Sequence, residues 1–373
     1  MRFFFTFAYQ MQTVVLGAYV YDITGDKFAL GLIGLSEAIP AIGLALYGGY
    51  LADKLEKRKL LMTVFAAIFL CALVMLVITH PGTAAHFHAG NITPIIYLMI
   101  FFNGVARAFY APAAFSTLAN SVPKEIYPNS TTWNISVWQI ASIIAPVAGG
   151  FIYGFFGITA AFGTILVFLL IAFTSAFLLK KIPPLFQAKE PIWQSLAEGV
   201  RFVFSNKMMI GALSLDMFSV FFGGAVALLP VFAKDILHVG PEGLGVMRGA
   251  TSLGAVLTVL AMARFSPMAK PWRNLLIAVT GFGLSIICFG LSHSFYLSLV
   301  FLFAEGAFDS VSMLIRGTLV QILTPDHMRG RVSSVNQMFI GSSNEIGAFE
   351  SGVAAKLLDT VPAVVFGGTM TLI

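Results

Sequence analysis

Charged residues are scarce in this chain. Only 10% of its 373 residues are Asp, Glu, Lys or Arg, whereas 58% are hydrophobic. A soluble domain carries roughly 25% charged and about 45–50% apolar residues. Together with a mean hydropathy of +0.88, this composition excludes soluble enzymes, nucleic-acid-binding proteins and disordered scaffolds. We therefore expect a chain surrounded by a lipid bilayer, with no nucleic-acid partner.

Cysteine and phosphate-binding motifs are also nearly absent. Cys71 and Cys288 lie inside apolar runs and offer neither a disulfide framework nor metal-ligand spacing. No Walker A pattern occurs, so bound ATP is not the expected energy source. His80, His86 and His88 fall in one short segment, but a solvated loop is favoured because their spacing is not that of a zinc site. We expect no enzymatic site, cofactor or metal.

Long apolar runs dominate what is present. A bilayer core of about 30 Å needs roughly 20 apolar residues per helix. Runs rich in Gly and Phe predict an all-α membrane protein of twelve transmembrane helices, near 3–21, 28–52, 59–79, 93–121, 131–155, 158–179, 208–233, 243–265, 273–292, 294–323, 331–357 and 361–373. The last run holds 13 residues, so we expect the twelfth span to be incomplete.

The distribution of Lys and Arg predicts the orientation of these spans. One set of alternate loops holds most of them, whereas the other set holds only Lys27, Lys234 and Lys356. Cytoplasmic loops carry the excess of positive charge in membrane proteins. The Lys-rich set is therefore expected in the cytoplasm, as in a multi-pass protein of a bacterial inner or plasma membrane.

A polar interruption divides the spans into six and six. It contains Pro183, Pro184 and Pro191, followed by an amphipathic segment over 192–204. The predicted organisation is an N-terminal bundle over 1–182, a cytoplasmic linker over 183–207 and a C-terminal bundle over 208–373. The amphipathic segment suits either a helix on the membrane surface or a solvated linker helix.

The two halves repeat one another. At an offset of 202 residues Asn134 falls on Asn336 and Gly150 on Gly352, and at an offset of about 211 Gly34 falls on Gly245. Two related six-helix halves are typical of transporters that alternate access to a central site.

Three motifs resemble the major facilitator superfamily. They are Gly49–Arg58 with Asp53, Ala141–Gly150 with Pro146, and Thr324–Arg331 followed by Asn336. The third is similar to the branch that includes enterobactin exporters and macrolide efflux proteins. The resemblance implies the major facilitator fold and a gate formed by Gly49, Asp53, Lys54, Arg58, Arg329 and Arg331. Asp53 would latch the cytoplasmic ends; a solvated loop carboxylate is the alternative.

Charges within spans are expensive and mark functional candidates. Arg107 and Asp309 occupy matching places at the 202-residue offset, and Glu37 and Arg248 do so at 211. We expect a cavity bordered by Arg107, Asp309 and Glu305, with Glu345 or Asp216 as other proton carriers; fixed structural ion pairs are the alternative. Arg316, near the end of its span, is expected to snorkel to the interface.

Polar and kink-forming residues complete the candidates. Hydrogen bonds to a cargo are expected from Asn103, Trp138, Gln139, Asn336, Gln337 and Asn344, with Tyr9 and Gln12 as similar candidates. Contacts between helices are the alternative role of such side chains. Pro146 with Gly149 and Gly150 is expected to bend the fifth span.

These features predict a secondary transporter. The first hypothesis is proton-coupled export, by a monomer, of a small amphiphilic molecule such as a siderophore or drug. Import of a nutrient or siderophore stays open because a fold does not set direction. A lipid flippase or a membrane sensor is a third possibility.

Overall fold

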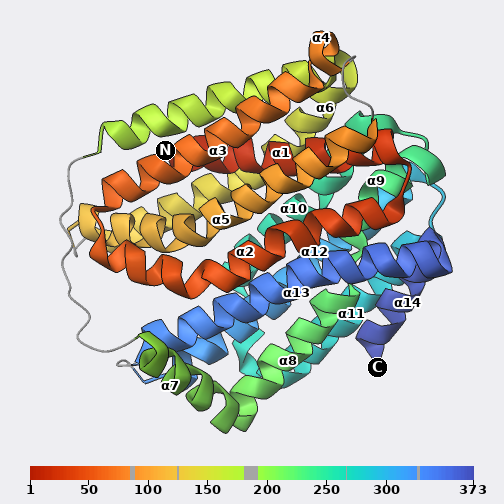
Figure 1. Ribbon diagram of the computed structural model, residues 1–373. Coiled ribbons are helices and arrows are strands. Elements are labelled where there is room, and N and C mark those ends of the chain that lie inside the picture. Colours follow the sequence, from red (N-terminus) through yellow and green to blue (C-terminus); the bar gives the residue numbers. More distant parts are fainter. Residues whose placement is uncertain (85–88, 124–125, 180–191, 266, 326–327) are drawn as a thin grey trace. The chain divides into compact units, whose positions relative to one another are not determined.

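The computed structural model describes residues 1–84, 89–123, 126–179, 192–265, 267–325 and 328–373, and these contain helices without strands (Figure 1). The elements are α1 (Arg2–Thr24), α2 (Lys27–Lys54), α3 (Lys57–Thr79), α4 (Pro81–Ala84), α5 (Ala89–Ser121), α6 (Tyr127–Phe177), α7 (Ile192–Ser205), α8 (Lys207–Phe222), η1 (Gly224–Leu228), α9 (Leu229–Val231), η2 (Phe232–Ile236), α10 (Gly240–Arg264), η3 (Pro267–Ala269), α11 (Pro271–Leu291), α12 (Phe295–Leu323), α13 (Arg329–Leu358) and α14 (Thr360–Leu372).

The helices account for the predicted apolar runs. Within the described part of the chain, nine helical segments are long and apolar enough to cross a membrane. One of them, α6, covers two predicted spans. Gly157 adopts φ 79° and ψ 177° between these spans and interrupts the regular helix there. Only glycine adopts such angles readily. The more polar α13 and the 13-residue α14 correspond to the last two runs.

The described helices group into two compact units. Unit 1 comprises Met1–Gly25, Leu35–Lys189 and Gly240–Gly245; unit 2 comprises Asp26–Gly34, Glu190–Val239 and Val246–Ile373. Both α2 and α10 therefore contribute to each unit. The bundle limits 1–182 and 208–373 stay predictions, and linker residues 183–191 lie outside the described residues.

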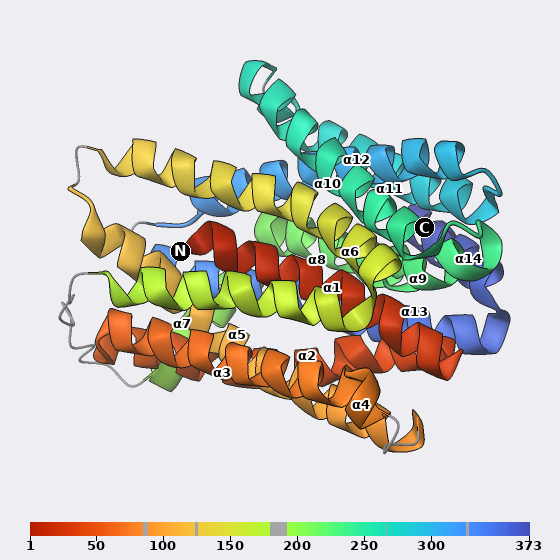
Figure 2. The same cartoon turned by 90° about the horizontal axis from the view of Figure 1, so that it is seen from above.

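Unit 1 is organised around α1, which runs alongside α6, while α3 packs against α5 and α6 (Figure 2). Ala8, Met11 and Val15 on α1 are fully buried. A β-carbon on Gly149 would lie 2.9 Å from Cγ of Met11, so this glycine permits close packing with α1. Pro146 and both neighbouring glycines keep helical backbone angles; the bend predicted there stays a prediction.

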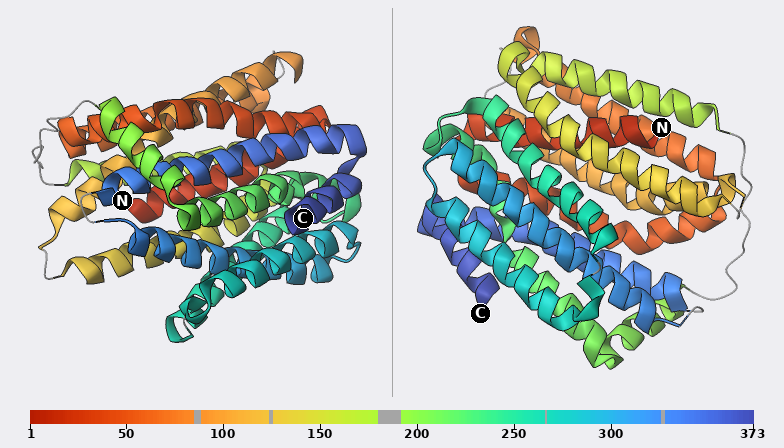
Figure 3. Two further views of the ribbon diagram at one scale, coloured as in Figure 1. Left: turned by 90° about the horizontal axis from the view of Figure 1, so that it is seen from below. Right: turned by 180° about the vertical axis from the view of Figure 1, so that it is seen from behind.

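In unit 2, α11 packs against α12 and α14, while α13 packs against α7 and α8. The predicted amphipathic segment is helical and lies against α13 (Figure 3). Val203 of α7 is fully buried in a cluster that includes Met209 and Val335. Val200 and Phe204 are exposed, so α7 presents apolar side chains away from its packed face. Its placement on the membrane surface stays a prediction.

Candidate functional site

Unit 1 places a charged cluster between α1, α2 and α5. Arg107 Nη1 lies 2.7 Å from Oε1 of Glu37 and donates to the hydroxyl oxygen of Tyr9 at 3.3 Å. The Tyr9 hydroxyl donates to the same Glu37 oxygen. The Arg107 side chain is 40% exposed, whereas that of Glu37 is 13% exposed. The carboxylate is therefore enclosed, and the guanidinium retains access to its surroundings.

Close packing of α2 on α5 brings this pair together. A β-carbon on Gly104 would lie 2.8 Å from Cγ of Pro40, and one on Gly48 would clash with the backbone of Ala108. Small residues let helices in membranes approach closely. The alignment of the two halves had matched Arg107 with Asp309; the ion-pair partner found here is Glu37, on the neighbouring helix of the same unit.

Unit 2 holds a sealed ion pair between α8 and α12. Asp216 pairs with Arg316 and accepts a hydrogen bond from Ser312 Oγ at 2.9 Å. Asp216 is 3% and Arg316 5% exposed. The prediction that Arg316 snorkels is wrong, because its guanidinium is neutralised inside the unit by a carboxylate on the adjacent helix.

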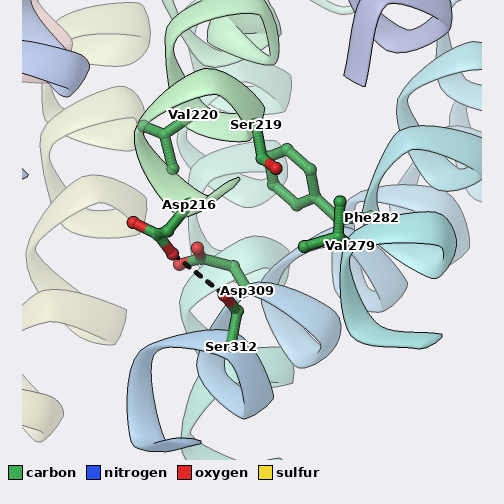
Figure 4. A pocket seen from close by; sticks show the side chains of 7 residues that line it. All are labelled: Asp216, Ser219, Val220, Val279, Phe282, Asp309 and Ser312. Carbon is green, nitrogen blue, oxygen red and sulfur yellow. Dashed lines mark hydrogen bonds between the residues drawn. The ribbon is translucent and has the colours of Figure 1, made fainter. Parts of the chain in front are cut away.

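A small pocket adjoins this pair (Figure 4). Its lining includes Asp216, Asp309, Ser219 and Ser312, and Figure 4 shows the Asp309 carboxylate directed toward Asp216. The free volume is about 10 Å³, close to the minimum needed for one water molecule. The pocket can hold a water molecule between the two carboxyl groups, but it is too small for a cargo molecule.

Unsatisfied polar atoms cluster between α10 and α12. Nε of Arg248, Oγ1 of Thr251 and Oε2 of Glu305 are buried without a hydrogen-bond partner. Glu305 is 7% exposed and interacts electrostatically with Arg248 and Asp309. Gly306 permits the close approach, since its β-carbon would clash with the Thr251 backbone. Such orphaned groups are rare in native proteins and call for a water, an ion or a functional role.

The other cargo candidates have different environments. Asn103 and Asn336 each have a buried side-chain oxygen without a partner. Trp138 is 39% exposed and Gln139 half-buried on α6. Asn344 is exposed and donates to the Ile340 carbonyl. The side chain of Gln337 lies outside the described residues, and half-buried Glu345 lies on α13.

The predicted cytoplasmic gate is only partly described. Gly49 is half-buried and Lys54 exposed on α2. Arg58 lies 4.8 Å above the ring of Phe177. The side chains of Asp53, Arg329 and Arg331 lie outside the described residues, so the latch stays a prediction.

Sequence reasoning missed two residues. Lys57, inside the Gly49–Arg58 motif, is only 2% exposed at the start of α3. Ser312, the hydrogen-bond donor to Asp216, lies three residues after Asp309, and this helical spacing was the available signal. Among the described residues, no group of three or more His, Cys, Asp or Glu could hold a metal ion. His86 and His88 lie outside that part of the chain.

The charged clusters on packed apolar helices point to a membrane transporter, and comparison with known proteins identifies the family. Residues 1–348 match the Major Facilitator Superfamily, and the chain belongs to it. It is therefore a major facilitator transporter and a multi-pass inner-membrane protein.

Its similarity to individual relatives is lower but extends over most of the chain. It is 24% identical to the enterobactin exporter EntS of Shigella flexneri over 96% of this chain and 84% of that protein. The EntS of Shigella boydii serotype 4 is 25% identical over 92% and 81%.

Solved structures show the same fold. The nucleoside transporter NupG superposes with a TM-score of 0.76 at 14% identity, covering 100% of this chain and 94% of that chain. A D-xylose-proton symporter gives 0.75 at 13% identity, with coverage of 100% and 93%. At these identities the likeness concerns the fold alone.

Proposed function

We propose that the protein is a proton-coupled exporter of a small amphiphilic molecule, with a siderophore as the first candidate cargo. The observation that carries the proposal is similarity, over nearly the whole chain, to proteins named enterobactin exporters. A drug or macrolide is the next candidate class, from the resemblance of the 324–336 segment.

The charged groups of unit 2 supply a physical basis for proton coupling. A buried carboxylate with one oxygen lacking a hydrogen-bond partner, as in Glu305, is costly in a medium of low dielectric constant. Proton binding at Glu305 would remove that cost and change the net charge beside Arg248 and Asp309. A protonation event there alters which arrangement of α10 and α12 is favoured.

The cluster of unit 1 suits recognition of an anionic aromatic cargo. The half-exposed Arg107 guanidinium offers positive charge, while the adjacent Tyr9 ring, 5.7 Å from Cζ of Arg107, offers an aromatic surface. Catechol groups combine a ring with acidic hydroxyls, so they complement both features. Bonding to Glu37 holds the guanidinium in place for this contact.

Transport into inside-out membrane vesicles tests the proposal. Iron-free enterobactin should accumulate when the vesicle interior is acidified, and a proton uncoupler should abolish the accumulation. Glu305→Gln should remove the gradient-driven component, whereas Glu198→Gln on the exposed face of α7 is the matched control. Accumulation only in right-side-out vesicles would instead establish an importer. Lipid movement without siderophore flux would establish a flippase.

A further inference from the structure

Side chains join α1 to α5 in a regular antiparallel register. The ring centroids of Phe5 and Tyr110 lie 4.0 Å apart. One turn further along α1, Tyr9 meets Arg107, which lies three residues before Tyr110 on α5. Residues three and four apart share one face of a helix. The next pair on these two faces is therefore expected three residues after Tyr9 and four residues before Arg107.

Those positions hold Gln12 and Asn103, whose side chains are buried, with residue exposures of 3% and 5%. Neither Nε2 nor Oε1 of Gln12 has a hydrogen-bond partner, and Oδ1 of Asn103 has none. An amide donor and an amide acceptor that face each other would bond if they lay within about 3.2 Å. It follows that a gap separates the two opposed amides.

The packing of α1 leaves room for this gap. Helix α1 packs mainly against α6 and makes few contacts with α5. The glycine of α5 next to Asn103 faces α2 instead, since a β-carbon on Gly104 would lie 2.5 Å from the carbonyl oxygen of Glu37. Side chains, rather than backbones in contact, therefore span the space between α1 and α5.

The unpartnered atoms define the chemistry that can occupy the gap. They are two carbonyl oxygens, which accept hydrogen bonds, and one amino group, which donates them. An ionised carboxylate only accepts, so it cannot serve the two carbonyl oxygens. A carboxamide supplies N–H donors together with a carbonyl acceptor, and it carries no charge whose burial would be costly. A water molecule also donates and accepts, and an entering amide would displace it.

The gap adjoins the cluster proposed above to contact the aromatic part of the cargo. Gln12 lies three residues from Tyr9, and Asn103 lies four residues from Arg107, which corresponds to about 4.5–6 Å along the helices. A carboxamide attached directly to an aromatic ring extends over a comparable length. One ligand can therefore place its ring beside Tyr9 and Arg107 while its amide enters the gap.

We propose that Gln12 and Asn103 form a subsite for the carboxamide group of an aromatic amide, whose ring lies against Tyr9 and Arg107. The inference rests on the proposed function only in placing the ring at this cluster, and it adds the functional group that the cargo carries beside the ring. The subsite favours an amide over the corresponding carboxylate, because a carboxylate would leave both carbonyl oxygens without a donor.

Binding of two small probes to the purified protein in detergent tests the subsite. Salicylamide and salicylate share a hydroxylated ring and differ in carrying an amide or a carboxylate. Titration calorimetry should show that the parent protein binds salicylamide. Gln12→Met and Asn103→Leu remove the two amides at similar side-chain size, and each should raise the Kd for salicylamide about tenfold. The Kd for salicylate should change less than about twofold in both variants.

A glutamine on another face of α1 provides the matched control. Gln10 donates to Ser142 Oγ at 3.3 Å, and Gln10→Met should leave the Kd for both probes unchanged. Thermal unfolding without a probe checks that the variants are folded. Gln12→Met and Asn103→Leu should leave the unfolding temperature nearly unchanged, because the atoms that they remove include those without hydrogen-bond partners.

Three results would overturn the subsite. They are a parent protein that does not bind salicylamide, equal increases in Kd for both probes, and variants that lose thermal stability but keep the parent Kd, which would indicate a water site only. Because no transport is measured, these results are independent of the direction of transport and of proton coupling. Loss of siderophore export from the vesicle assay with persistent amide binding would refute the exporter and leave the subsite in place.

Discussion

The two units differ in how charged side chains at repeat-related positions are paired. In unit 1 the acid Glu37 lies on α2 and the base Arg107 on α5, and they form an ion pair. At the repeat-related positions in unit 2 the signs are reversed, with Arg248 on α10 and Asp309 on α12. There Arg248 Nε and the neighbouring Glu305 Oε2 are left without hydrogen-bond partners. The repeat preserves where charges lie, while buried atoms of the charged side chains lack hydrogen-bond partners in the cluster of unit 2.

We expect the two clusters to have different roles. In the Glu37–Arg107 ion pair the carboxylate orients the guanidinium, which stays accessible to a ligand. Unsatisfied buried groups carry a standing free-energy cost, which a proton, a water or a movement of α10 against α12 would relieve. The Asp216–Arg316 pair is a third case, satisfied and sealed, and its expected role is structural.

The largest effect should come from breaking the sealed pair. Asp216→Asn leaves the Arg316 guanidinium buried without its counter-charge and should lower the free energy of unfolding by about 3–5 kcal/mol. Glu37→Gln in the half-exposed pair should cost about 1 kcal/mol or less. Thermal unfolding of the purified protein in detergent compares them. Equal losses of thermal stability would contradict the distinction between a sealed and an accessible pair.

A compensated variant sharpens this comparison. Asp216→Leu combined with Arg316→Met removes both charges together and should recover most of the stability lost in Asp216→Asn, since apolar side chains can replace a buried pair. No recovery would mean that packing around Asp216, rather than its charge, sets the stability.

The next effect concerns transport rather than folding. Glu305→Gln should leave thermal stability nearly unchanged, because it removes a buried carboxylate whose Oε2 lacks a hydrogen-bond partner, yet it should reduce proton-driven transport roughly tenfold or more. Asp309→Asn should do the same if the two groups share the proton. Transport that stays gradient-driven in both variants would move the coupling site elsewhere.

A smaller effect is expected in unit 1. Tyr9→Phe removes one hydrogen bond to Glu37 and should weaken cargo binding by about 1 kcal/mol, or roughly fivefold in KM, without changing the maximal rate. Tyr296→Phe, at a tyrosine that is 78% exposed, is the matched control. A fall in maximal rate at unchanged KM would assign Tyr9 to the conformational cycle instead.

The smallest effect concerns pH at the ion pair between Lys27 and Asp359. Hydrogen bonds from Lys27 and from the Thr360 backbone, and then the charge of Lys27, lower the pKa of Asp359 below its usual range. The pairing is therefore present above that lowered pKa and lost as pH falls through it. The loss of thermal stability caused by Lys27→Ala should therefore be the same at every pH between about 5 and 8. A loss that changes within that window would show that another titrating group controls this ion pair.

Much of the architecture could be predicted from the sequence. Long apolar runs predicted the helical membrane fold. Lipid offers no hydrogen-bond partner to backbone N–H and C=O groups, and a helix satisfies these groups within its own segment. Internal repetition aligned Gly34 with Gly245 and Gly150 with Gly352, but that Gly31 meets Gly352 and Gly150 meets Gly245 came from the structure. The family followed from motifs in α2, α6 and α13, and the family match confirmed it.

The partners of the charges could not be predicted in this way. Sequence offset matched Arg107 with Asp309, yet Arg107 pairs with Glu37 because Gly48 and Gly104 bring α2 against α5. Arg316, close to the end of its helix, gave no sign that Asp216 lies opposite it. Which side chains become neighbours depends on the rotation and separation of the helices. A pattern along the sequence contains no information on either quantity.

The sequence by itself determined that this chain is a helical membrane protein and which costly charges its apolar segments keep. These follow from transfer free energies, which are properties of single residues and short segments. Only the tertiary structure decided which charges are paired, which are orphaned and which helices touch. Those outcomes depend on ångström-scale distances between segments hundreds of residues apart, as Lys27 and Asp359 illustrate.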